Sequence, residues 1–250
     1  MRKPALLLVA AVVAANVHAA HPAVVAAPQA AQGGGTIKGH VQLMGKLPGN
    51  PVIRMGRDPM CAQINRGKQV VQETVMANLK GDLANVFVKL TGSFPKTQTP
   101  TSPVVIDQKG CLYIPRVVGV QSGQPLQIRN SDQFLHNVRS STGVKANEFN
   151  VGQPLAGMSS QFKLQEDPSM VHIKCDVHSW MTAFVGVVSH PYFAVSNHAG
   201  TFEISNVPPG NYEIQAWHER YGPIKQSIRV RAGAATTVEF AYTGNEKAPS

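Results

Sequence analysis

Apolar and polar residues alternate in short runs along most of the chain, which is the pattern of half-buried β-strands. Residues 36–43 (TIKGHVQL) and 212–217 (YEIQAW) show the alternation clearly, and Gly, Pro, Asn or Asp interrupts each run. Helical periodicity is weak throughout, so an all-β protein is predicted. The candidate strands are residues 36–43, 70–76, 84–90, 103–107, 112–120, 125–130, 136–140, 161–164, 170–174, 182–189, 200–204, 212–217, 226–230 and 237–241.

The N-terminus has the pattern of a signal peptide. Arg2 and Lys3 precede an apolar stretch at 5–15, and Val17-His18-Ala19 offers a small-residue cleavage site. We predict a signal peptide at 1–19, export to the periplasm and no membrane span in the mature protein. An uncleaved anchor is the alternative.

Three folded or flexible regions are expected after the signal peptide. Residues 20–35 are rich in Ala, Pro and Gly and predict a flexible linker. Residues 36–189 and 190–245 are assigned to a larger and a smaller β-sandwich. The pattern leaves open whether 36–94 joins the first sheet or forms a module of its own.

The charge balance narrows the class of partner. The chain carries 23 Lys and Arg against 14 Asp and Glu, a formal net charge of +9. A basic surface suits an acidic protein, a membrane surface or nucleic acid. Export and the scattered positions of the basic residues argue against nucleic acid.

Three cysteines in an exported chain leave one thiol unpaired. A free thiol is oxidised in that environment unless it is buried or bound to a metal. Cys175 lies in a cluster of other metal-ligand types, so Cys61 and Cys111 are the expected disulfide pair.

Cys175, His178 and Met181 place a thiolate, an imidazole and a thioether three residues apart. Two His and one Cys in a plane with a weak axial Met form a blue-copper electron-transfer site. His136, at the start of a predicted strand, is the best candidate for the second imidazole. Asn137 beside it could hydrogen-bond the ligand loop and hold its backbone.

Residues 111–188 resemble a cupredoxin, through Asp132-x3-His136-Asn137 and the Cys-x2-His-x2-Met loop. The short gap between His178 and Met181 is similar to that of amicyanin. Over 36–245 the chain resembles bacterial methylamine-utilisation-like proteins, in which a carboxypeptidase-regulatory-like domain follows the cupredoxin. Many such relatives have Pro at the position of Ser179.

The resemblance implies a Greek-key β-sandwich, a small transthyretin-like C-terminal β-sandwich, one copper ion and single-electron transfer. It also implies that His178 is the ligand nearest solvent, with Trp180 in a docking patch for a redox partner such as a cytochrome or an oxidoreductase.

No pattern of catalytic residues competes with this interpretation. The chain has no His-Cys-His run, Gly-x-Ser-x-Gly, His-Glu-x-x-His or P-loop, so an enzyme is not expected. Three alternatives stay open: a copper chaperone or storage protein, a structural β-sandwich module with a vestigial site, and zinc in place of copper.

Overall fold

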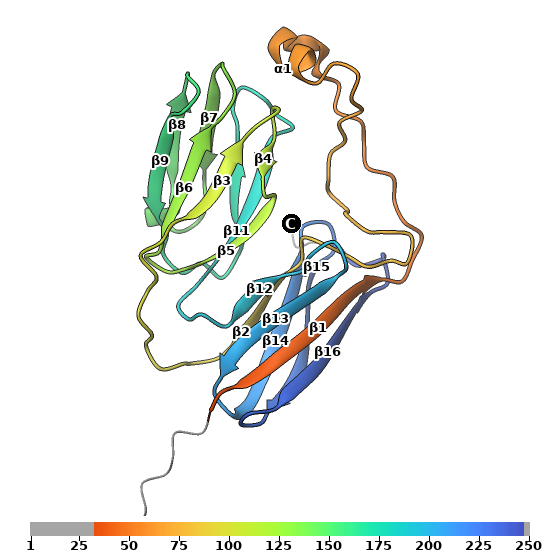
Figure 1. Cartoon of the computed structure of the whole chain (residues 1–250), viewed down its shortest axis with the longest axis vertical. Coiled ribbons are helices and arrows are strands. Elements are labelled where there is room, and N and C mark those ends of the chain that lie inside the picture. Colours follow the sequence, from red (N-terminus) through yellow and green to blue (C-terminus); the bar gives the residue numbers. More distant parts are fainter. Residues whose placement is uncertain (1–32, 248–250) are drawn as a thin grey trace, which may run out of the picture. The chain divides into compact units, whose positions relative to one another are not determined.

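The computed structural model describes residues 33–247. The predicted signal peptide at 1–19 lies outside the described residues, as does most of the predicted linker at 20–35. Strands dominate the described chain, which confirms the all-β class (Figure 1). No helix among residues 33–247 is long and apolar enough to cross a membrane.

Three short helical segments and sixteen strands make up the described fold. The helical segments are η1 (Met55–Arg57), α1 (Pro59–Ile64) and η2 (Lys145–Asn147). The strands are β1 (Gly35–Leu43), β2 (Phe87–Thr91), β3 (Val104–Gln108), β4 (Tyr113–Ile114), β5 (Val117–Gln121), β6 (Pro125–Asn130), β7 (His136–Ser140), β8 (Phe149–Gln153), β9 (Ser159–Lys163), β10 (Val171–Lys174), β11 (Thr182–Val188), β12 (Phe193–Val195), β13 (Thr201–Val207), β14 (Gly210–His218), β15 (Gly222–Val230) and β16 (Ala235–Tyr242).

Strands β3 to β11 form one β-sandwich, called here the central sandwich. Its sheets have the orders β5-β11-β10-β7-β8 and β4-β3-β6-β9. The chain crosses between the sheets at β4–β5, β5–β6, β6–β7, β8–β9 and β9–β10. Alternate residues such as Ile128, Val138 and Ile173 are fully buried between the sheets.

The remaining strands form a second β-sandwich, called here the terminal sandwich. Its sheets have the orders β13-β1-β16 and β12-β2-β14-β15. Figure 1 shows β1, in red, lying between the blue strands β13 and β16. Ile37, Ile204, Ile214 and Phe240 belong to its separate core.

The terminal sandwich is therefore completed by strands from the N-terminal part of the chain. β1 pairs in parallel with β16 over eight residue positions, and β2 pairs with β12 and β14. The expected division into 36–189 and 190–245 differs from this arrangement, because strand pairing joins segments far apart in sequence. The central sandwich is instead an insertion between β2 and β12.

Two glycines allow the sandwiches to pack closely. Gly119 of β5 and Gly186 of β11 are register partners. A Cβ on Gly186 would lie 2.3 Å from the ring of Phe87, and one on Gly119 would lie 2.5 Å from the ring of Phe193. Both rings belong to the terminal sandwich, so any side chain at either glycine would push them away.

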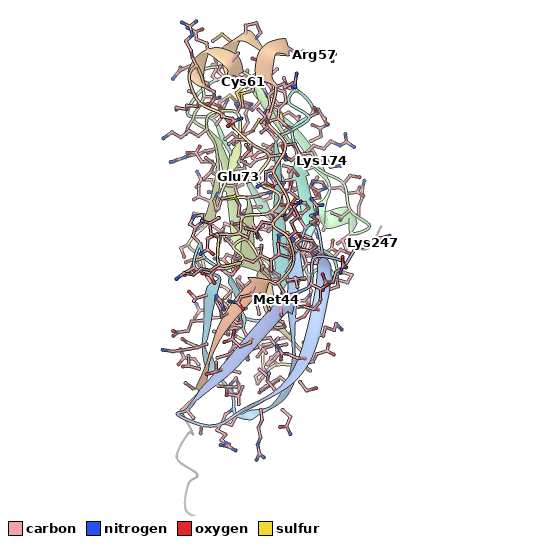
Figure 2. All side chains as sticks on the ribbon, turned by 90° about the vertical axis from the view of Figure 1, so that its right-hand side faces the viewer. Met44, Arg57, Cys61, Glu73, Lys174 and Lys247 are labelled. Carbon is pink, nitrogen blue, oxygen red and sulfur yellow. A yellow bond between two sulfur atoms is a disulfide. The ribbon has the colours of Figure 1, made fainter. Side chains whose placement is uncertain are left out.

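Between β1 and β2 the chain makes a long excursion that contains η1 and α1 and reaches the central sandwich. Cys61 of α1 forms a disulfide with Cys111, 50 residues away in sequence. Residues 55–65 of this excursion are called here the cap. Figure 2 shows Cys61 and Arg57 together at the end of the structure where the cap lies.

The strand predictions differ from the structure at four places. Residues 70–76 form only an isolated bridge at Val71, and the 112–120 run is split into β4 and β5 around Pro115. Strands β8 and β12 and the helix α1 were not expected. α1 is six residues long, too short for a helical period to stand out.

Candidate metal centre

Adjacent strand ends bring the predicted ligands together. His136 is the first residue of β7, and Cys175 follows the last residue of β10. β7 and β10 are neighbours, with Arg139 opposite Lys174. The loop from Cys175 to Met181 then connects β10 to β11, so its side chains meet His136 at one end of the central sandwich.

The ligand loop is closed by its own backbone. Met181 N–H donates to the carbonyl of His178 at 2.9 Å, and Cys175 N–H donates to the carbonyl of Met181 at 3.4 Å. Cys175 and Met181 are buried in the core of the central sandwich. Cys175, His178 and Met181 are all buried at this loop.

Two nitrogen atoms and one sulfur atom converge at the site. Nδ1 of His136 lies 3.0 Å from Nδ1 of His178, and Sγ of Cys175 lies 3.7 Å from Nδ1 of His178. One ion bound about 2.0 Å from each nitrogen and 2.3 Å from sulfur implies donor separations of roughly 3.3–3.6 Å. The observed separations are close to these values, so the three donors fit one metal ion.

A carboxylate holds the far nitrogen of each histidine. Nε2 of His136 lies 2.8 Å from Oδ2 of Asp132, and Nε2 of His178 lies 2.8 Å from Oδ2 of Asp58. If each Nε2–H donates to its carboxylate, the two Nδ1 lone pairs face one another at 3.0 Å. Such an arrangement needs a cation or a shared proton between them, and carboxylate-bound imidazoles are typical of metal ligands.

Asn137 links the ligand strand to the ligand loop. Its backbone N–H lies 3.4 Å from Sγ of Cys175, and its Oδ1 accepts from the N–H of Asp176 at 3.2 Å. Its Nδ2 donates to Asn150 Oδ1 at 2.6 Å, which fixes the amide orientation. These are the contacts expected of a residue that holds the loop backbone.

The site favours an ionised cysteine. Burial opposes ionisation of Cys175, but hydrogen bonds from His136 and His178 outweigh it and lower the pKa of the thiol to about 6. Burial would lower the pKa of His136, whereas Asp132 and the Cys175 sulfur raise it overall. The thiolate is the form of cysteine that binds metals.

The expectation that His178 lies nearest solvent is wrong. Its side chain is 1% exposed, because the cap covers it and Asp58 contacts its Nε2. Asp58 also accepts from the N–H groups of Met60 and Cys61 and so begins α1. It thereby joins the cap to the candidate metal ligand.

The contacts of Asp132 with His136 and of Asp58 with His178 were not predicted from the sequence. Asp132 lies four residues before His136, and this spacing could have suggested the contact. Asp58 is 120 residues from His178, and no local pattern in the sequence signals that pairing.

The expected disulfide is present and lies close to the site. One ligand-type atom from each of Cys61, Cys111 and His178 lies within 4.8 Å of the others. Because Cys61 and Cys111 are bonded to each other, Cys175 is the free cysteine of the described chain.

Trp180 is half-buried rather than fully exposed. Its indole N–H donates to the carbonyl of Cys111 at 3.0 Å, and its ring lies 5.2 Å from that of His178. It borders a recess of about 220 Å³ together with Tyr113 and Arg116. Its part in docking stays a prediction.

Comparison with family models supports the C-terminal part of the expected resemblance. Residues 183–243 match the family model of the carboxypeptidase regulatory-like domain. This range covers β12 to β16, and β1 and β2 supply the other strands of the terminal sandwich. Comparison with curated protein sequences gives no match.

The solved structures that resemble the chain include copper proteins of cupredoxin type. A Cu-containing nitrite reductase from Thermus scotoductus is 18% identical with a TM-score of 0.32, over 40% of this chain and 25% of its own length. A Cu(I) amicyanin mutant is 18% identical with a TM-score of 0.30, over 40% of this chain and 97% of its own. A purple cupredoxin from Nitrosopumilus maritimus is 21% identical with a TM-score of 0.28, over 33% of this chain and 97% of its own. The chain therefore spans only a quarter of the nitrite reductase.

Proposed function

We propose that the chain is an exported mononuclear blue-copper protein that carries single electrons between redox partners. The observation that carries the proposal is the convergence of His136 Nδ1, His178 Nδ1 and Cys175 Sγ, with a carboxylate on each Nε2. Soft thiolate and imidazole donors together are what copper prefers. Met181 is proposed as the weak axial ligand.

In this role copper would supply a one-electron Cu(I)/Cu(II) couple. The protein would supply a fixed set of donors, since carboxylates orient both imidazoles and Asn137 holds the loop. It would also exclude water, because His136, Cys175, His178 and Met181 are all buried. A rigid, dry site requires little rearrangement between the two charge states.

Burial of the donors favours a carrier over the alternatives. A chaperone that hands copper to a partner needs accessible ligands, and here the cap covers the site. An enzyme needs an open coordination position for substrate, and four buried donors would fill a mononuclear site. The disulfide suits an oxidising compartment, which agrees with the proposed periplasmic location.

The first experiment is metal loading of the purified full chain with Cu(II), and separately with Zn(II). We expect intense visible absorption from thiolate-to-Cu(II) charge transfer, one copper per chain, and loss of the band in Cys175→Ala. Asp176→Ala, at the exposed neighbouring position, is the matched control and should keep the colour. A colourless Cu(II)-loaded wild type would refute the blue-copper proposal, and preference for zinc with no redox activity would favour a structural site.

A further inference from the structure

A groove of about 990 Å³ lies beside the cap, and its lining includes Asp132, the partner of His136. Met60 and Ile64 of α1 line it from the cap, and Ile114 lines it from the central sandwich. These three apolar side chains are 45%, 40% and 48% exposed. Exposed apolar residues gathered in one groove commonly mark an interaction site.

Two side chains that line the groove lie next to the candidate histidine ligands. Phe134 lines it, and its ring centroid lies 5.2 Å from that of His136 and 6.4 Å from that of His178. Asp132 also lines it and contacts Nε2 of His136. A protein seated here would lie one side chain away from each imidazole.

Unpaired charge around the groove is positive. Lys68 and Lys109 line the groove and are exposed. Arg57 in the cap and Arg66 directly after it are also exposed (Figure 2 shows Arg57). Asp132 in the groove already accepts from a histidine. A basic rim around an apolar floor complements an acidic partner and repels a second copy of this chain, whose net charge is +9.

We propose that this groove is the docking surface for an acidic redox protein, which exchanges electrons with the metal centre through the Phe134 side of the site. The inference rests on the proposed electron-transfer function. It places docking on the cap and the groove beside it, because the cap buries His178, the residue expected to face the partner. In the exchange one electron passes between the partner and copper, and no bond forms or breaks.

The first test measures docking without copper. The metal-free full chain, labelled with ¹⁵N, is titrated with an acidic plant-type [2Fe–2S] ferredoxin as the probe. We expect shifted amide signals at residues 60–68, 109–114 and 131–134. Shifts confined to the recess around Trp180, or to the terminal sandwich, would overturn the proposal, as would self-association through the same residues.

The second test measures electron transfer by stopped-flow, with reduced ferredoxin and the Cu(II)-loaded chain. Lys68→Glu/Lys109→Glu should lower the second-order rate constant at low ionic strength roughly tenfold or more, since charge steering contributes that much. Lys80→Glu/Lys163→Glu changes the charge equally at exposed positions away from the groove and should have a much smaller effect. A basic cytochrome as the probe should react faster with the Lys68→Glu/Lys109→Glu variant than with wild type.

Equal slowing by the two double variants would overturn the docking proposal and leave the copper function standing if the visible band is intact. A chain that takes up no copper but shows ferredoxin-induced shifts in the groove would overturn the proposed copper function and would support the groove as a docking surface.

Discussion

Asp58 should determine both the position of the cap and the strength of metal binding. Asp58→Ala removes the acceptor for the N–H groups of Met60 and Cys61 and for Nε2 of His178. Loss of an N-cap costs about 1 kcal/mol. Loss of a hydrogen bond to a charged group costs about 1.5–3 kcal/mol. The metal-free variant should therefore be less stable by roughly 3 kcal/mol.

Asp58→Ala should also lower the affinity of the site for the metal. Residues that orient a ligand histidine typically contribute about 10- to 100-fold to affinity, which corresponds to about 1.4–2.7 kcal/mol. Asp58→Asn should lose much less, because Asn also caps helices and offers an oxygen to His178. The two variants thus separate the effect of the hydrogen bonds from that of the charge.

The assay is competition of the full chain with a chelator for Cu(II), combined with urea unfolding of the metal-free protein. Asp107→Ala, which removes a carboxylate from a surface ion pair with Arg129, is the control and should leave affinity unchanged. Wild-type affinity in folded Asp58→Ala would refute the idea that the cap orients His178.

Three further results are expected. Cys61→Ala/Cys111→Ala should destabilise the chain by about 4 kcal/mol, from the entropy of a loop with a sequence separation of 50; an unchanged urea midpoint would contradict this. Arg116→Met should cost about 3–5 kcal/mol, because it leaves the buried Glu219 carboxylate, now 2.8 Å from the guanidinium, unpaired; Arg116→Met/Glu219→Leu should recover most of that loss. Burial, with Arg116 and Arg220 nearby, lowers the pKa of His218 to about 3, so the unfolded chain binds the extra proton as pH falls below 6.5. Stability should then decline by at most about 1.4 kcal/mol per pH unit, and His218→Gln should show a shallower decline in urea unfolding between pH 7 and pH 4.

Much of the candidate site could be predicted from the sequence because its parts are local. The spacing of Cys175, His178 and Met181 is short enough for one loop to bring them together. The odd number of cysteines indicated the Cys61–Cys111 disulfide, and alternation predicted most strands. Each of these signals lies within a few residues or in a simple count.

The arrangement of the strands could not be predicted in the same way. Alternation shows that β1 has one buried face, but it does not say which sheet supplies the neighbours. β1 pairs with β16, some 200 residues later, because the two cores each need complete sheets to exclude water. The same limit explains why β1 and β2 were assigned to the first sandwich, although the chain does pass from the central to the terminal sandwich near residue 190.

The sequence by itself determined the all-β class, the disulfide and the chemical types of the donors, since these depend on local periodicity and residue identity. Only the tertiary structure decided what surrounds the donors. The cap comes from an excursion between two strands of the terminal sandwich, yet its Asp58 contacts His178 across 120 residues of sequence. Packing, and no local pattern, buries that histidine and leaves the groove at Met60, Ile64 and Ile114 as an exposed apolar surface near the site.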